Sequence, residues 1–460
     1  ARSLSSPVTH SKLLGLIQFS FLFSSSFSFN LFPQFQTKET VTTTLDGNLI
    51  PSVSETINIL PNEPSHSLPF HPNSIQFNTS FVTRPHPYVI PIPGQRTTAC
   101  AAKFRSLSSR IMNMWWEDGK GGLFQGTLQP GQESTINTYE GHVFFFTDSK
   151  IKEDIISRIL ITKDMTLYAI EDERFPVANR DVLEQTRAEM EFNKKYVKEN
   201  NGVQWRHYYG PHGPRPPPTL YMLPAQQVGQ QHAVTTPYNH WKCDGAPSDC
   251  FDSSPLTLTM ECISLEPRAF IVENFLSEAE ADHLIALAKP KIKASTVGNT
   301  EGGGVRASET RTSHNTWLAR SASNVTDTIT RRVADVLGLD EAILTPQRNS
   351  EEMQVVHYIN GQKYDSHHDW GVSGYPESRY ITMLMYLTTQ LNDDSGGETS
   401  FPKGGENGGI KVKPVKGTAM FFYNLLPDGN GDDLSLHAAL PVWSGEKWLA
   451  NYWIWDPKKR

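Results

Sequence analysis

The spacing of apolar residues changes several times along the chain, and each change predicts a different kind of structure. Residues 96–178 contain short apolar or alternating runs, such as FQGTLQPGQESTINTYEGHVFFFTD, with turn residues such as Pro130-Gly131 between them. Runs of this kind are typical of a small antiparallel β-sandwich. Residues 179–202 then place apolar side chains at helical intervals and end near Gly202, which predicts one amphipathic helix.

A second region, residues 258–460, begins with strand-like and helical patterns and ends in a series of short strands. Its segment SEAEADHLIALAKPK opens with Ser277 and carries Glu280 three residues later, a capping box that predicts a helix start. A second helix is predicted for NVTDTITRRVADVLGL. After residue 351 the closely spaced strands favour a jelly roll, or double-stranded β-helix. The predicted fold class is therefore α+β multidomain: a jelly-roll domain with supporting helices, preceded by a small β-sandwich.

The remaining stretches predict a leader and two linkers. Residues 1–38 contain no Asp or Glu, and the apolar run from Leu13 to Phe23 has the length of a signal-peptide core. A Ser-rich leader also fits a plastid or mitochondrial transit peptide, but entry into the secretory pathway and endoplasmic reticulum is favoured. We expect membrane attachment only through such an N-terminal anchor. Residues 39–95 and 203–257 are rich in proline and predict extended linkers, the second with a cysteine loop.

Composition narrows the classes of partner. The net charge of the 460-residue chain is −7 and no block of basic residues occurs, which argues against a nucleic-acid-binding protein. The four cysteines include no CxxC pair of the kind that binds zinc. Cys243 and Cys250 flank a loop rich in Gly, Pro and Asp, and both a disulfide and free thiols are compatible with this spacing.

One stretch, GQKYDSHHDW, carries candidate metal chemistry. Side chains alternate along an extended segment, so His367 and Asp369 share one side while His368 faces the other. His437, at the start of a later strand, offers a third ligand. Two histidines and one carboxylate that leave positions open are the ligand set of non-haem Fe(II) oxygenases, although catalytic zinc also uses it.

Lys447 favours the iron alternative. It lies ten residues after His437, across a turn, so it is expected to point into the mouth of the same barrel. A buried lysine is unfavourable unless an anion pairs with it. The dicarboxylate 2-oxoglutarate supplies such an anion, and Tyr358 offers a hydroxyl to the same carboxylate.

Seven segments in order carry a resemblance, including VVHYINGQKYDSHHDW, GGETSFP and SLHAALPVWSGEKWLANYWI. Over about residues 258–456 the chain resembles the catalytic domain of plant and algal prolyl 4-hydroxylases. The resemblance implies hydroxylation of proline in polypeptides to 4-hydroxyproline, with decarboxylation of 2-oxoglutarate to succinate and CO2. It also implies Fe(II) and O2 as cofactor and cosubstrate, ascorbate as reductant, and a proline-containing polypeptide as partner. A dioxygenase acting on another substrate, and a non-catalytic protein that binds hydroxyproline or peptides, are the alternatives.

The resemblance also implies roles for individual residues. The implied iron ligands are His367, Asp369 and His437. The residues implied to hold 2-oxoglutarate are Lys447, Tyr358 and Thr399. Arg379 and Trp453 match positions that line the peptide groove, and the Gly-rich segment 296–308 matches a loop that closes over substrate.

The upstream sandwich carries a second, shorter resemblance. LQPGQESTINTYEGHVFFF resembles the β-domain of the von Hippel–Lindau protein, which binds hydroxyproline peptides. The matching residues are Thr138, Tyr139, Gly141 and His142. Phe144 stands where that family has a pocket tryptophan, and Met114 and Phe124 are aligned with an aromatic residue and a tyrosine. The match implies docking of a peptide or protein on this domain. It leaves open whether hydroxyproline is captured or the sandwich only stabilises the fold.

Overall fold

The computed structural model describes most of the chain from residue 79 onward. The described ranges are 79–81, 84–92, 99–151, 154–172, 174, 180–206, 218, 220–243, 250–295, 310–371, 378–390, 392–405 and 408–456. The expected leader, residues 1–38, and the Gly-rich segment 296–308 lie outside these ranges. No helix within them is long and apolar enough to cross a membrane.

Residues 99–170 form two small sheets around one apolar core. The strands of the first, in spatial order, are β6 (Glu133–Tyr139), β3 (Ala99–Ser106) and β9 (Leu167–Ile170). Those of the second are β5 (Leu123–Leu128), β4 (Met112–Trp116), β7 (Val143–Asp148) and β8 (Ile155–Leu160). Alternate side chains of both sheets, Phe104 and Phe146 among them, are buried in this core. The pairing is antiparallel except between β3 and β9, which run parallel. The helix expected over 179–202 is α1 (Arg180–Glu199).

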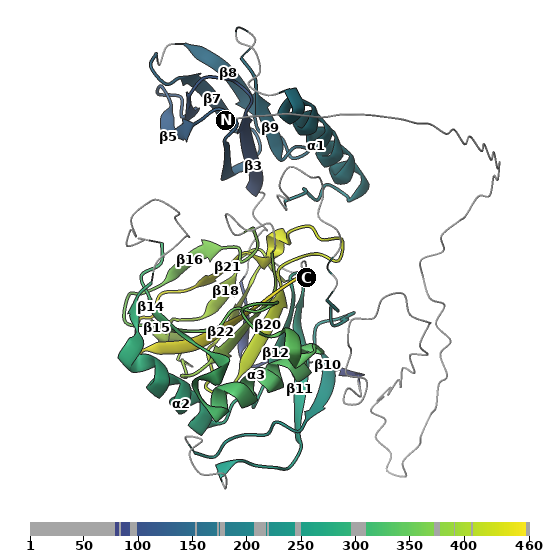
Figure 1. Cartoon of the computed structure of the whole chain (residues 1–460), viewed down its shortest axis with the longest axis vertical. Coiled ribbons are helices and arrows are strands. Elements are labelled where there is room, and N and C mark those ends of the chain that lie inside the picture. The colour runs from purple at the N-terminus through teal and green to yellow at the C-terminus, as the bar shows by residue number, and fades with distance from the viewer. Residues whose placement is uncertain are drawn as a thin grey trace, which may run out of the picture. The chain divides into compact units, whose positions relative to one another are not determined.

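The C-terminal region is built on a ten-stranded sheet and a five-stranded sheet (Figure 1). In spatial order the larger sheet contains β1 (Thr79–Phe81), β10 (Gln230–Thr236), β11 (Leu256–Leu265), β12 (Arg268–Val272), β20 (Ala419–Tyr423), β17 (Arg379–Tyr386), β22 (Lys447–Trp455), β15 (Met353–Tyr358), β14 (His314–Leu318) and β13 (Lys293–Ala294). The smaller sheet contains β16 (Tyr364–His367), β21 (His437–Ala439), β18 (Thr399–Phe401), β19 (Ile410–Val412) and β2 (Val89–Pro91). All of these pairs are antiparallel.

Each face of the larger sheet is buried against a different layer. One face packs on α2 (Glu278–Ala288) and α3 (Asn324–Leu337), through side chains such as Leu284, Ile329 and Met383. The other face packs on the smaller sheet, where Phe401 meets Phe422 and Leu449. Two facing antiparallel sheets with helices outside one of them form the predicted jelly roll with its supporting helices.

The structure differs from the expected linkers at three places. Strand β10 lies within residues 203–257 and pairs along its length with β11. Strands β1 and β2 lie within residues 39–95, and each forms one edge of a sheet of the C-terminal region. Strands β1 and β2 have only three residues each, and all three strands pair with segments distant in sequence, so local pattern did not reveal them.

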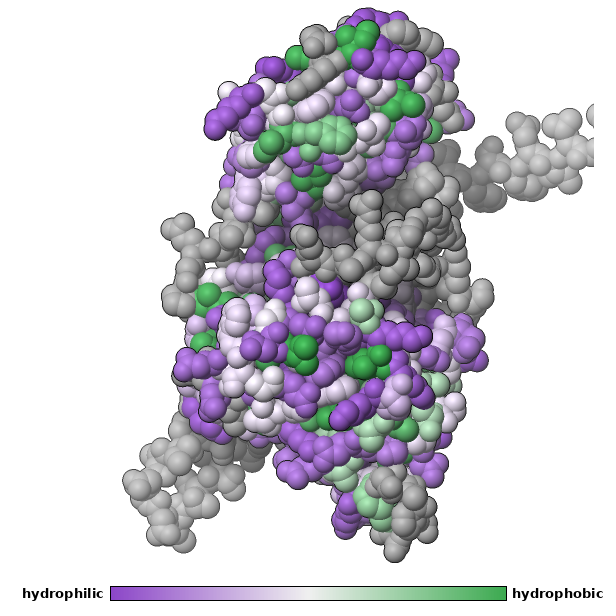
Figure 2. All heavy atoms as spheres, turned by 90° about the vertical axis from the view of Figure 1, so that its left-hand side faces the viewer, coloured by the Kyte–Doolittle hydropathy of each residue, from purple (hydrophilic) through white to green (hydrophobic). Residues whose placement is uncertain are grey.

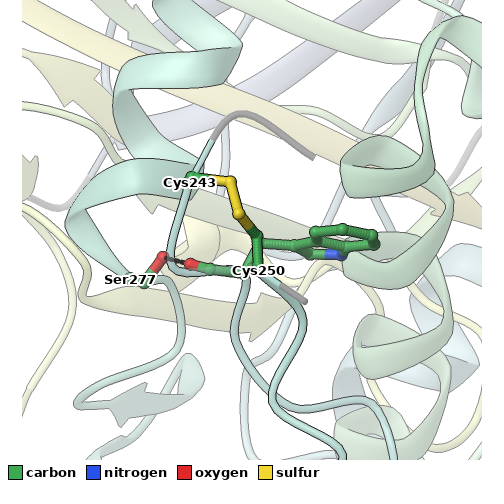
Figure 3. Close-up of a disulfide and its surroundings, with 4 residues drawn as sticks. Cys243, Cys250 and Ser277 are labelled. Carbon is green, nitrogen blue, oxygen red and sulfur yellow. Dashed lines mark hydrogen bonds between the residues drawn. A yellow bond between two sulfur atoms is a disulfide. The ribbon is translucent and has the colours of Figure 1, made fainter. Parts of the chain in front are cut away.

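The cysteine loop is closed in the structure. Cys243 and Cys250 form a disulfide with a Cα–Cα distance of 5.5 Å (Figure 3). The backbone of the adjacent Trp241 is fixed at the start of α2, because its carbonyl accepts a hydrogen bond from Ser277 Oγ and its N–H donates to Glu280 Oε1. The predicted capping box of Ser277 and Glu280 is present as well. The segment that leads into the disulfide is therefore hydrogen-bonded to the start of α2.

The surface is mainly hydrophilic on the face shown in Figure 2, with scattered hydrophobic residues. Exposed apolar side chains of the residues 99–170 sheets include Leu123, Phe124, Tyr139, Ile155 and Leu160. Scattered apolar residues of this kind are normal on a protein surface.

Candidate active site

The three expected metal ligands lie together at one end of the smaller sheet. His367 is directly opposite His437 in the pairing of β16 with β21, and Asp369 follows two residues after β16 ends. One ligand atom from each residue lies within 4.8 Å of the other two. Nε2 of each histidine is 3.6 Å from an Asp369 carboxylate oxygen. The structure thus brings together the alternating pair and the distant histidine that the sequence offered as candidate ligands.

The orientation of each imidazole is fixed by a backbone carbonyl. Nδ1 of His367 lies 2.8 Å from the Asp365 carbonyl, and Nδ1 of His437 lies 2.9 Å from the Ser435 carbonyl. A proton on each Nδ1 leaves both Nε2 lone pairs directed at the shared position, as metal ligation requires. Burial and the neighbouring His437 lower the pKa of His367 to about 3, which keeps this ring neutral.

Asp369 is held by two further donors. Its Oδ2 accepts hydrogen bonds from Thr382 Oγ1 at 2.7 Å and Trp453 Nε1 at 2.8 Å. Burial by itself raises the pKa of Asp369, but electrostatic interactions with His437, Arg379 and His367 and the hydrogen bond from Trp453 outweigh burial, so the pKa is lowered. The carboxylate is therefore ionised and oriented for a cation.

Arg379 and Trp453 lie together beside Asp369. The Arg379 guanidinium stacks 3.9 Å from the centre of the Trp453 ring and makes two hydrogen bonds to Glu351. It also lies 3.6 Å from the Asp369 carboxylate. Trp453 is buried, and the half-exposed Trp317 ring lies 5.9 Å from it. The sequence indicated a peptide-contacting role for Trp453 but missed its hydrogen bond to Asp369.

Lys447 is a buried lysine in the core of the jelly roll. Its side chain is fully buried, and Nζ has no hydrogen-bond partner among the described residues. Tyr358 is its neighbour across the β15–β22 pair, and the rings of Tyr358 and Tyr386 lie 5.6 and 5.9 Å from Nζ. Burial lowers the pKa of Lys447 to about 7, against the opposing effect of the Glu398 charge. A buried ammonium without a partner is unfavourable unless an anion completes its surroundings, so these residues fit a carboxylate-bearing cosubstrate.

The hydroxyl of Thr399 connects to this group through a residue that the sequence did not single out. Tyr386 Oη donates to Thr399 Oγ1 at 2.9 Å, and both side chains are buried. Tyr386 and Thr382 alternate along β17 on the face that meets the smaller sheet. The alternation in RYITMLMY was the available signal, but it does not distinguish a site tyrosine from a core tyrosine.

His368 faces away from the metal position, as the alternation predicts, but it is not at the surface. Its side chain is mostly buried, and Nε2 lies 3.3 Å from the carbonyl of Asp433. Strand geometry predicts its direction, whereas its partner lies 65 residues later and could not be read from the sequence.

Some of the residues that the second resemblance matched lie close together. Thr138 Oγ1 lies 2.9 Å from His142 Nδ1, and the rings of Tyr139 and Trp116 lie 5.5 and 5.2 Å from the imidazole. Met114 is buried in the core instead. The aromatic residue beside His142 is therefore Trp116 rather than a residue at position 114.

The ligand group and the buried lysine together fit an iron and 2-oxoglutarate site. Two imidazoles and one carboxylate supply three ligands and leave the other coordination positions for cosubstrate and oxygen. Lys447 supplies the positive charge that a second carboxylate needs. Bound iron would thus explain the group of three ligands, and a bound 2-oxoglutarate would explain the buried Lys447.

Comparisons with known proteins agree with this geometry. Residues 353–455 match the family model described as the 2OG-Fe(II) oxygenase superfamily. The chain is 38% identical over 213 residues to "Probable prolyl 4-hydroxylase 3" of Arabidopsis thaliana, covering 42% of this chain and 71% of that protein. It is also 38% identical over 214 residues to prolyl 4-hydroxylase 5 of the same plant, covering 42% and 70%.

A solved structure is similar over a comparable share of the chain. The viral collagen prolyl hydroxylase of Paramecium Bursaria Chlorella virus-1, in its 2OG complex, is 32% identical, with a TM-score of 0.32 and coverage of 41% of this chain and 95% of that one. The plant relatives are similar enough in sequence, over enough of their length, to show the family of this chain. The chain belongs to the prolyl 4-hydroxylase family.

Proposed function

We propose that this protein is an Fe(II)- and 2-oxoglutarate-dependent dioxygenase that hydroxylates proline residues in polypeptides to 4-hydroxyproline. The observation that carries the proposal is the His367, Asp369 and His437 group in the same jelly roll as the unpaired buried Lys447. The three ligands by themselves could hold zinc, and a buried lysine by itself could pair with any anion. Together, in a member of this family, they supply the two ends of a site for iron and a dicarboxylate.

The residues of this chain have distinct parts in that reaction. His367, Asp369 and His437 would hold iron, and Lys447, Tyr358 and Thr399 would bind and orient 2-oxoglutarate. When bound, iron supplies with O2 the oxidation that converts a proline C4–H to C–OH as 2-oxoglutarate becomes succinate and CO2. The buried walls around Lys447 exclude water from the cosubstrate, which strengthens its ion pair. Ascorbate is the expected reductant.

Arg379 and Trp453 are proposed to line the path of the peptide. The stacked Arg379 and Trp453 side chains, with Trp317 beside them, offer flat surfaces of the kind on which proline rings pack. The hydrogen bond from Trp453 to Asp369 would place this surface next to the iron.

A peptide panel tests the reaction and its alternatives. Proline-rich and collagen-like peptides, a lysine-containing peptide, and buffer alone would be incubated with Fe(II), 2-oxoglutarate and ascorbate. We expect a mass gain of one oxygen on proline peptides only, and none with His367→Ala. Oxygen gain on lysine alone would identify another dioxygenase, and peptide binding without succinate would identify a binding protein.

We also propose that the residues 99–170 sheets dock part of the polypeptide substrate. The Trp116, Tyr139 and His142 group, which resembles part of a hydroxyproline pocket, supports this proposal. Docking near a catalytic domain on the same chain would raise the local substrate concentration. With His142→Ala, KM for long proline-rich peptides should rise, while KM for short ones should stay unchanged. If His142→Ala changes KM by the same factor for long and for short peptides, docking on these sheets is rejected.

We propose the secretory pathway as the compartment, with any membrane attachment made through the N-terminal segment. Support comes from the apolar run Leu13–Phe23 and from the disulfide, because disulfides persist in oxidising compartments. Protease protection in isolated microsomes, followed by alkaline extraction, tests both points. A protein recovered in plastids or mitochondria would reject the proposal.

A further inference from the structure

The turn that precedes His437 carries a carboxylate that contacts a lysine, an arginine and an imidazole. Asp433 begins the short 3-10 turn Asp433–Ser435, which ends two residues before His437. Lys403 Nζ donates to both carboxylate oxygens of Asp433, at 3.0 and 2.8 Å. Arg206 Nη1 lies 2.7 Å from the same carboxylate, and His368 Nε2 lies 3.6 Å from it.

The donors in this cluster are buried. Lys403, Arg206 and His368 have only 6, 4 and 11% of their side chains exposed. Buried charges are maintained only where paired geometry offsets their desolvation, and removing one partner is strongly unfavourable. The cluster is therefore a fixed connection rather than a loose surface ion pair.

The cluster joins the two segments that carry the metal ligands. His368 lies between His367 and Asp369 in sequence, and its Nε2 is 3.3 Å from the Asp433 carbonyl. Two residues on, Trp370 Nε1 donates to the carbonyl of Asp432 at 3.0 Å. The segment His367–Asp369 is thus attached to the Asp432–Ser435 turn on the side away from the metal position.

The same turn fixes the second histidine ligand. Ser435 Oγ and N–H both donate to the Asp432 carbonyl, which closes the turn. The Ser435 carbonyl then lies 2.9 Å from His437 Nδ1 and sets the direction of the ring. A shift of Asp433 would therefore move the carbonyl that orients His437.

We propose that Lys403 and His368, acting through Asp433, are positioning residues that hold the His367–Asp369 segment and His437 at the separation that the metal requires. This inference rests on the proposed function only in taking iron as the resident metal. Lys403, His368 and Asp433 are not themselves metal ligands. Partners that orient metal ligands typically change metal affinity by about 10- to 100-fold when they are removed.

The test is binding of Mn(II) alone to the full chain, measured by calorimetry and by the Mn(II) electron paramagnetic resonance spectrum. Lys403→Met should raise the Kd for Mn(II) about tenfold and alter the spectrum of the bound ion. Lys403→Arg, which retains the charge and donors, should restore both. His368→Phe keeps a ring but removes the donor, and should weaken Mn(II) binding in the same direction.

Lys416→Met is the matched control, because Lys416 makes an ion pair with Asp282 at a partly exposed site unconnected to this turn. It should leave the Kd for Mn(II) unchanged. Urea unfolding of every variant separates affinity from stability. If Lys403→Met and His368→Phe bind Mn(II) as wild type does, whatever their stability, the positioning role is wrong. Mn(II) binding is measured without turnover. A failure to hydroxylate proline would therefore reject the proposed function but would not decide whether Lys403 and His368 position the ligands.

Discussion

At the scale of single residues, the site is a set of buried polar groups in which nearly every member has an identified partner. Asp369 accepts from Thr382 and Trp453, and each ligand histidine faces a carbonyl. Lys447 is the exception, with no hydrogen-bond partner in the described ranges. A buried donor left unsatisfied carries a penalty of about 1–3 kcal/mol or more for a charged group. A bound carboxylate would remove that penalty.

The affinity for 2-oxoglutarate should therefore depend on pH through Lys447. Its pKa in the free protein is lowered to about 7 by burial, and a bound carboxylate would raise it. The pKa values of Tyr358 and Tyr386 are raised by burial, so both phenols stay neutral. Above pH 7, binding must take up a proton, and Kd should rise by up to about tenfold per pH unit.

Titration of 2-oxoglutarate into the Mn(II)-loaded protein between pH 6 and 9 measures this dependence. Lys447→Met should bind weakly at every pH in that range. A wild-type Kd that stays constant from pH 6 to 9 would show that Lys447 does not meet the cosubstrate as an ammonium.

Trp453→Phe should weaken metal binding as well as peptide binding. Phenylalanine keeps an aromatic surface for Arg379 but removes the indole N–H that donates to Asp369. We expect the Kd for Mn(II) to rise about tenfold, as for other groups that orient metal ligands.

Trp455→Phe is the control for that variant, because the Trp455 indole donates to Glu351 rather than to Asp369. Calorimetry with Mn(II) compares the two. Equal affinity in wild type and Trp453→Phe, together with a higher KM for peptide, would limit Trp453 to substrate contact.

At the scale of elements, strand pairing brings the ligands together and the helical layer supports the sheet from behind. Arg332 of α3 is fully buried and bonds Glu280 of α2 with both terminal nitrogens. It also donates to the carbonyls of Tyr238, Asn239 and Phe275. One side chain thus fastens the segment before the disulfide to both helices.

Arg332→Met should lower the free energy of unfolding by about 3–5 kcal/mol, because it leaves the Glu280 charge buried and unpaired. Chemical denaturation monitored by tryptophan fluorescence measures the change. The neighbouring Arg331→Met is the control: Arg331 pairs with Asp327 and Glu341 at a partly exposed site, where such pairs contribute about 0–1 kcal/mol. Similar losses for both variants would contradict the special role of Arg332.

At the scale of the whole molecule, the sequence predicted what depends on local periodicity and fixed motifs. Alternation predicted that His367 and Asp369 share one side of an extended segment, and the capping box marked the start of α2. The resemblance to prolyl 4-hydroxylases supplied the complete ligand set and is supported by the plant relatives.

Pairings between distant segments could not be predicted in the same way. Strand β10 and the partner of His368 depend on residues tens of positions away, and a single sequence carries no signal for such contacts. Tyr386 was missed for a related reason, since its alternation is shared by ordinary core residues. The unpredicted features are those that three-dimensional assembly, rather than local propensity, determines.

The central claim is that this chain hydroxylates peptidyl proline with Fe(II) and 2-oxoglutarate. Its most direct test is a reaction under ¹⁸O₂ with a proline-rich peptide, with mass spectrometry of peptide and succinate. We predict ¹⁸O at C4 of hydroxyproline and ¹⁸O in succinate for the wild-type protein, and neither for His367→Ala. Unlabelled peptide and no succinate from an iron-loaded, folded wild-type protein across the peptide panel would contradict the account.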